Sequence, residues 1–189
     1  MIEDSRLIAR TVKVASYTGG DVIIADGLKP GETVLTTQIA DARAVYREME
    51  PDVRDEFEAK GVLYVRSYHD QGGAGKTWQE SFETDSRDAV EAFCVEAGMT
   101  CEWYDWGMRT LTRGPGTYRH PATGEDAWIN QADQFHAEFN TPWDGSFDID
   151  AYDETQLPFH AYYGDGSPIA IDALNESRRA KYACEVLFD

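Results

Sequence analysis

The sequence predicts a single α+β domain over residues 1–189, with a sandwich-like or barrel-like sheet and a few helices packed on it. Three observations support this fold class. Short runs of β-branched and aromatic residues are separated by glycine and proline turns, only a few segments have helical periodicity, and 42% of the 189 residues are hydrophobic. This length and composition are sufficient for one domain with a buried core.

The first part of the chain carries two predicted strands and two predicted helices. Residues 22–25 form an apolar run between glycine-containing turns, which is typical of a buried strand. Residues 41–49 are predicted to be helical, and Pro51 fits the first turn of a second helix that ends at Gly61. Residues 62–68 are predicted to form a strand because they are rich in β-branched and aromatic side chains.

The second part of the chain alternates helices with short strands. Thr84 or Asp85 is the predicted N-cap of a helix. One face of this helix is apolar and consists of Val90, Phe93, Cys94 and Ala97. Residues 100–130 contain short strand-like pieces separated by turns. Residues 172–182 are predicted to form a last helix, and residues 184–188 to begin another strand.

Charge and composition exclude several classes of partner. The formal net charge of −18 repels phosphates and anionic surfaces, so we expect no nucleic-acid and no membrane partner. No apolar run approaches the ~20 residues that span a bilayer. The first residues lack the basic and apolar regions of a signal peptide. The three cysteines have no metal-like spacing, so we expect reduced thiols in a cytoplasmic protein.

Six segments carry a resemblance to a known family. They lie at residues 39–46, 61–68, 77–82, 119–125, 128–132 and 162–169. In this order and spacing they resemble the SyrP-like branch of the TauD/TfdA (taurine dioxygenase-like) family of iron(II)/2-oxoglutarate oxygenases. The resemblance implies a double-stranded β-helix, or jelly roll, that has flanking helices and is incomplete at its C-terminal end. It also implies that the ancestral role was oxidation of a small amino-acid-like molecule in secondary metabolism.

The iron site of that family requires two histidines and one carboxylate on one face of the metal. By the resemblance, the first histidine and the carboxylate fall at Val12 and Val14, and neither side chain can bind a metal. The distal histidine and the arginine that binds 2-oxoglutarate follow a turn that the resemblance places beyond residue 189. We therefore expect no iron site and no cofactor in this chain.

The position of the 2-oxoglutarate-binding threonine has two placements under the resemblance. A gapless alignment places it at Thr37, although Val34 and Leu35 then replace the two glycines of the motif. Residues 31–33, which read Gly-Glu-Thr, are the rival placement. Both placements stay open.

Two further patterns offer rival sites. His136 and Glu138 form a His-x-Glu pattern, and His160 would complete a facial triad of substitute metal ligands. The alternative is a partly buried histidine beside a solvated glutamate. Residues 70–77 nearly spell a phosphate-binding P-loop, but Asp70 replaces its first glycine and would turn a negative charge toward phosphate. We interpret residues 70–77 as a glycine-rich loop.

Three functions are compatible with these residues. The first is a TauD/TfdA-like protein that has lost the iron triad and acts as a non-oxygenase binding or accessory protein, or as a metal-free enzyme, on a small amino-acid-like molecule. The second is an oxygenase that a partner chain completes, with iron(II) and 2-oxoglutarate bound. The third is an iron enzyme with the substitute ligands.

The strand predicted at residues 184–188 also predicts a protein partner. It contains one charged residue and no proline, so its edge is poorly protected against pairing with another strand. We therefore expect a homodimer, or a complex with a complementary protein chain, that is paired through this strand.

Overall fold

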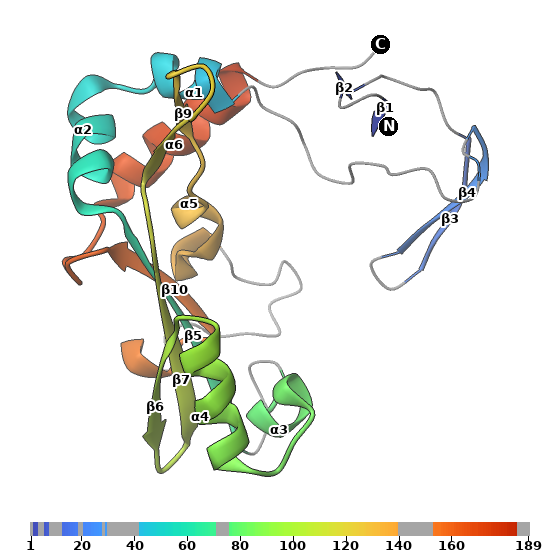
Figure 1. Ribbon diagram of the computed structural model, residues 1–189, viewed down its shortest axis with the longest axis vertical. Helices are drawn as coiled ribbons and strands as arrows, with labels where there is room; N and C mark the ends of the chain where they lie inside the picture. The colour runs from blue at the N-terminus through green and yellow to red at the C-terminus, as the bar shows by residue number, and fades with distance from the viewer. Residues whose placement is uncertain are drawn as a thin grey trace. The chain divides into compact units, whose positions relative to one another are not determined.

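A computed structural model describes most of the chain after residue 41 and short segments before it (Figure 1). The described residues are 2–3, 6–7, 13–18, 21–27, 29, 42–70, 76–139 and 153–184. The chain divides into two compact units, one of residues 1–39 with 185–189 and the other of residues 40–184. The single domain expected over residues 1–189 stays a prediction.

The described elements of the first unit are short antiparallel strand pairs. β1 (Ile2–Glu3) pairs with β2 (Arg6–Leu7), and β3 (Lys13–Thr18) pairs with β4 (Asp21–Asp26). β4 confirms the strand predicted at residues 22–25.

Two helices open the second unit at the predicted positions. They are α1 (Ala42–Glu48) and α2 (Pro51–Lys60). Pro51 lies in the first turn of α2, where the N–H that proline lacks would have no partner within the helix. Gly61 ends α2 with a φ of 69°, a backbone conformation that favours glycine.

A four-stranded antiparallel sheet forms the centre of the second unit. Its strand order is β10 (Phe159–Tyr163), β5 (Val62–His69), β7 (Gly107–Gly114) and β6 (Thr100–Tyr104). β5 confirms the strand predicted at residues 62–68. It pairs with β7 over its whole length and with β10 over Val62 to Arg66, so it is an inner strand of the sheet.

A separate hairpin follows β7 in the sequence. It consists of β8 (Thr117–Arg119) and β9 (Asp126–Trp128), which pair antiparallel. Together with β6 and β7, this hairpin confirms the short strands and turns predicted within residues 100–130.

One face of β5 contributes to two hydrophobic clusters. Alternate residues of a strand point to the same side, so Val62, Tyr64, Arg66 and Tyr68 share a face. Val62 and Tyr64 pack in the larger cluster, which includes Val45, Met49, Phe57, Trp128, Ala161, Tyr163 and Leu174. Tyr68 belongs to the smaller cluster, whose other buried members are Trp78, Val90, Cys94 and Met108. Arg66 therefore lies between the two clusters along the strand.

Helices α3 (Trp78–Phe82) and α4 (Arg87–Glu96) contribute to the smaller cluster. A capping box begins α3: the Thr77 hydroxyl accepts from the Glu80 N–H at 3.2 Å, and the Glu80 carboxylate accepts from the Thr77 N–H at 3.0 Å. The N-cap of α4 is Ser86, whose Oγ accepts from the Ala89 N–H at 3.3 Å.

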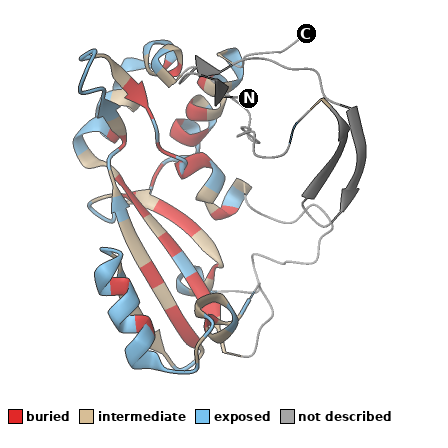
Figure 2. Ribbon diagram, turned by 45° about the vertical axis from the view of Figure 1, so that its right-hand side comes forward, coloured by how far each residue is buried: buried red, intermediate tan, exposed pale blue. Residues whose placement is uncertain are grey.

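Two details of the α4 prediction were wrong. The predicted caps, Thr84 and Asp85, precede the true N-cap, and the Thr84 hydroxyl instead accepts from the backbone N–H of that cap. Val90 and Cys94 are buried as expected, but the Phe93 side chain is 52% exposed and Ala97 is also exposed. Figure 2 shows α4 exposed along most of its length, because it meets the sheet through one narrow stripe.

The remaining described elements are short helices and one longer helix. They are α5 (Ala132–Phe135), the 3-10 turns η1 (Ala137–Phe139) and η3 (Glu154–Gln156), and α6 (Ile171–Ala183). α6 confirms the helix predicted at residues 172–182. Cys184 ends that helix, and residues 185–188 of the predicted last strand lie outside the described residues.

Helices and antiparallel sheets agree with the predicted α+β class. The sheets formed by the described residues do not close into a barrel, so the jelly roll stays a prediction. Cys94, Cys101 and Cys184 form no disulfide bond. Among the described residues, no helix has the length and apolar character that crossing a bilayer requires.

The close approach of Gly116 to α2 provides a stability test. A Cβ atom at Gly116 would lie 2.1 Å from the Phe57 carbonyl oxygen, whereas one at Gly114 would meet only the Tyr64 ring at 3.7 Å. We expect Gly116→Ala to lower the free energy of unfolding by about 1–3 kcal/mol, because the backbone must move. The matched control, Gly114→Ala, is expected to change it far less. Urea denaturation of both variants measures the free energy of unfolding. Equal decreases in the two variants would contradict the close approach of Gly116 to α2.

Candidate functional site

The structure brings together two of the three substitute metal ligands. His136 follows α5 and His160 lies on β10, and their ring centroids are 4.2 Å apart at an interplanar angle of 47°. Nδ1 of His160 accepts a hydrogen bond from the Ala137 N–H at 3.3 Å. Nδ1 of His136 accepts one from the Glu138 N–H, also at 3.3 Å. The two rings therefore pack against each other and bond to the backbone of η1.

Glu154 is the acidic residue next to this histidine pair. Its Oε1 lies 3.8 Å from Nε2 of His160 and accepts a hydrogen bond from the Tyr162 hydroxyl at 2.7 Å. Burial lowers the pKa of His160 to about 4, with a further lowering by His136 and an opposing effect of Glu154. Burial also lowers the pKa of His136. Both imidazoles are therefore neutral at pH 7.

This arrangement does not fit a facial triad. A triad requires two histidines and a carboxylate that direct their lone pairs at one point. Here Nδ1 of each ring is directed at a backbone N–H. In the part of the chain that the structure describes, no group of three His, Cys, Asp or Glu side chains is placed to hold a metal ion. His136, Glu138 and His160 therefore do not form such a group.

The other predicted site residues fall mostly outside the described part. The residues outside the described part are Val12, Thr37 and the rival placement at residues 31–33. Val14 lies on β3, where its backbone is in register with Ile24 between two irregularities of the pairing. Their roles stay predictions.

The glycine-rich loop at residues 70–77 is described only at its two ends. Asp70 accepts a hydrogen bond from the indole N–H of Trp78, the first residue of α3. Thr77 is the N-cap of the same helix. At both ends the loop therefore positions α3, which supports a structural role for these residues.

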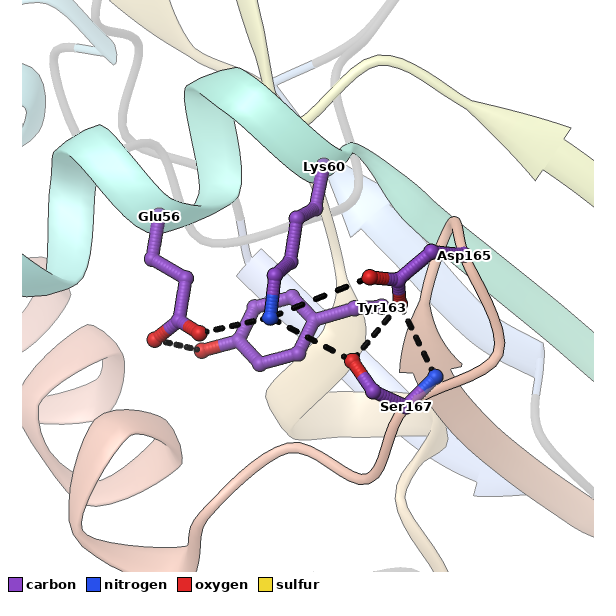
Figure 3. Close-up of polar contacts among 5 residues, drawn as sticks. All are labelled: Glu56, Lys60, Tyr163, Asp165 and Ser167. Atoms are coloured by element: carbon purple, nitrogen blue, oxygen red, sulfur yellow. Dashed lines mark hydrogen bonds and ion pairs between the residues drawn. The ribbon is translucent and has the colours of Figure 1, made fainter.

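A second polar cluster joins α2 to the turn after β10 (Figure 3). Lys60 Nζ lies 2.8 Å from Glu56 Oε1 and donates to the Ser167 hydroxyl at 3.3 Å. The Tyr163 hydroxyl donates to the other Glu56 oxygen at 2.9 Å. Asp165 accepts from the Ser167 N–H at 2.9 Å. The cluster ties the segment at residues 162–169 to the end of α2.

The protonation states of this cluster argue against acid–base chemistry. A lysine over a phenol ring, as Lys60 lies 4.5 Å above Tyr163, can lower the pKa of the phenol. Burial and the hydrogen bond to Glu56 instead raise the pKa of Tyr163. The hydrogen bond to Glu56 likewise raises the pKa of Lys60. Both groups keep their protons at neutral pH, so we interpret the cluster as a structural clamp.

The segment at residues 128–132 also has a structural role. Asn130 is 4% exposed, and its Nδ2 donates to the Gly116 carbonyl at 2.8 Å while its Oδ1 accepts from the Ala132 N–H at 3.2 Å. Lys181 forms an ion pair with the buried Asp133 and donates to the Asn130 carbonyl. Two of the family-like segments therefore build the framework of the second unit.

A cavity of about 640 Å³ lies between β5 and the helices α3 and α4. Its lining includes Arg66, Tyr68, Lys76, Ser81, Glu83 and Phe93. This volume is in the range that holds small molecules. The sequence did not predict this cavity. The one sequence signal for this cavity was Arg66, the one Lys, Arg, Asp or Glu residue of β5.

The histidine pair gives the protein a predicted pH dependence. The pKa of His160 falls from 6.5 in the unfolded chain to about 4 in the folded chain. Between these values the unfolded chain binds more protons, so the free energy of unfolding falls as the pH falls. Protonation of the unfolded chain at His160 lowers the free energy of unfolding by up to about 3 kcal/mol over this pH range.

We expect His160→Asn to reduce this loss between pH 6.5 and about 4, because the titrating imidazole is gone. Urea denaturation at several pH values measures how the free energy of unfolding depends on pH. The same substitution at His120, an exposed turn residue, is the control. An unchanged pH profile in His160→Asn would contradict the assignment.

Known proteins match most of this chain. The family described as "Taurine catabolism dioxygenase TauD, TfdA family" matches residues 31–188, a range that includes Thr37 but neither Val12 nor Val14. The dapdiamide synthesis protein DdaC of Enterobacter agglomerans is 33% identical over 163 residues, which are 85% of this chain and 47% of that protein. The clavaminate synthase-like protein At3g21360 of Arabidopsis thaliana is 27% identical over 153 residues, which are 76% of this chain and 43% of that protein.

The chain thus spans less than half the length of both relatives. The family match covers most of the chain, including the described sheet and helices of the second unit. The chain belongs to the TauD/TfdA family, whose members are typically iron(II)/2-oxoglutarate-dependent dioxygenases.

Proposed function

We propose that this chain is a TauD/TfdA-family protein that binds a small amino-acid-like molecule, as a non-oxygenase binding or accessory protein, and holds no iron(II) through its described residues. The observation that carries the iron-free part of this proposal is the geometry of the two histidines. Nδ1 of His136 and of His160 accepts a backbone N–H, and the rings pack on each other. Recruiting both Nδ1 atoms to a metal would break these two hydrogen bonds.

The relatives support the small-molecule part of the proposal. One is named for dapdiamide synthesis and the other for its likeness to clavaminate synthase. We infer from these names that this chain also acts in secondary metabolism.

The second candidate function is an iron(II)/2-oxoglutarate-dependent oxygenase whose site is completed by residues outside the described part or by a partner chain. The coverage of the relatives favours it, because more than half the length of each has no counterpart in these residues. The partner would be a second copy or a complementary chain that pairs through residues 184–188.

We predict that the purified chain, loaded with iron(II) without oxygen and then desalted, retains far less than one equivalent of iron. Elemental analysis by mass spectrometry measures the retained metal. His136→Ala and His160→Ala are expected to leave this value unchanged. Iron near one equivalent would contradict the proposal. If the iron is lost in His136→Ala, the substitute ligands bind it, and if it is retained, the second candidate function gains support.

We predict that millimolar 2-oxoglutarate produces no shift in the melting temperature. The net charge of −18 opposes binding of a dianion, and a ligand raises the melting temperature only when it binds the folded chain. Sodium chloride at matched ionic strength is the control. A saturable shift beyond that control would favour the oxygenase.

A further inference from the structure

We propose that the cavity between β5, α3 and α4 binds a free α-amino acid with an apolar side chain. In this site the carboxylate of the amino acid contacts Arg66 and Lys76, and its ammonium group contacts Glu83. The site rests on the proposed small-molecule function for its ligand class, and it does not depend on whether the chain holds iron.

Arg66 is held in a position suited to a carboxylate. Its guanidinium lies over the rings of Tyr68 and Phe159, with its central carbon 5.1 Å and 5.0 Å from the two ring centroids. Stacking of this kind fixes the guanidinium plane and leaves its N–H fork free to bind a carboxylate in a bidentate manner. Arg66 itself is exposed between the two hydrophobic clusters, so a ligand can reach its guanidinium from solvent.

The cations of the cavity have no acidic partner among the described residues. Six other basic residues, Arg43, Arg54, Lys60, Arg109, Arg179 and Lys181, each form an ion pair with an aspartate or glutamate. Arg66 and Lys76 form none with the described part of the chain, a state that they share with Arg47, Arg87, Arg113, Arg119 and Arg178. Both are therefore available to an anionic group of a ligand.

The two acidic residues of the cavity differ in whether their carboxylates are available to bind a ligand. Glu80 is engaged in the capping box of α3, where it accepts from Thr77. Glu83 ends α3 with a φ of 53°, in the left-handed region that is uncommon for a residue other than glycine. Its side chain is exposed and makes no hydrogen bond with a described residue, so it can accept from an ammonium group.

The cavity also presents an unsatisfied hydroxyl and an apolar surface. Ser81 Oγ is buried without a hydrogen-bond partner, a state that costs free energy in an empty cavity. The Phe93 ring is 52% exposed and packs edge-on against Phe82, with centroids 5.6 Å apart. The half-buried Met99 extends this surface. An apolar ligand side chain would cover it, and a turn of the Ser81 side chain toward the cavity would let the ligand carboxylate accept from its hydroxyl.

The charge of the chain selects a zwitterion over an anion. The net charge of −18 repels a simple carboxylate from solution, whereas a neutral zwitterion meets no such barrier. Charges of both signs line the cavity, so both ends of an amino acid find a counterpart there.

Isothermal titration calorimetry with L-phenylalanine tests the site. We expect saturable binding that is lost with L-phenylalaninamide, which lacks the carboxylate, and with 3-phenylpropanoate, which lacks the ammonium group. Arg66→Gln is expected to weaken binding by about tenfold or more, because a charge-assisted hydrogen bond is removed. Glu83→Gln is expected to weaken it without loss of fold. The matched control is Arg119→Gln at an exposed arginine of β8.

Ser81→Ala separates a binding role from a structural one. We expect it to raise the melting temperature of the free protein, because the unpaired hydroxyl is removed, and to weaken L-phenylalanine binding. Unchanged binding in this variant, or equal losses in Arg66→Gln and Arg119→Gln, would overturn the site.

The outcomes also separate this site from the proposed function. Binding of L-phenylalanine that none of these substitutions changes would overturn the site and keep the small-molecule function. An absence of binding in an iron-free protein would overturn the amino-acid site alone. Retained iron near one equivalent would overturn the proposed function without deciding the site.

Discussion

The fold of the second unit depends on strand β5 (Val62–His69). It is hydrogen-bonded to β7 along its whole length and to β10 along much of it, while one of its faces packs into both hydrophobic clusters. A shift of its register by one residue would turn Val62 and Tyr68 to the opposite face, so both clusters fix the same register. Arg66 lies on that face between the clusters, and its position follows from theirs.

The segments that resemble the TauD/TfdA family act in this structure mainly as framework. Asn130 bonds to Gly116, which itself packs closely on α2, and Tyr163 with Ser167 is held by the end of that helix. Family membership therefore does not by itself indicate iron chemistry, because these contacts require no metal. The oxygenase would need ligands that the described residues do not provide as a group.

Local features of the fold were predictable from sequence, whereas features that depend on packing were not. Pro51, Gly61 and the composition of β5 indicated the first helices and the central strand correctly. The N-cap of α4 was misplaced because Thr84, Asp85 and Ser86 can all cap a helix, and only the backbone conformation selects among them. The sequence analysis grouped His136 with His160 as metal ligands, but the packing of their rings could not be predicted from it. The cavity beside Arg66 joins residues far apart in sequence, so no local pattern indicated it.

A crystal structure of the protein grown without oxygen in the presence of iron(II) and L-phenylalanine tests the central claim most directly. We predict an amino acid between β5 and α3, with its carboxylate on Arg66 and its ammonium group on Glu83. We also predict that His136 and His160 keep their backbone hydrogen bonds and carry no metal. An iron ion bound by either histidine, together with a cavity beside Arg66 that contains only solvent, would contradict the claim.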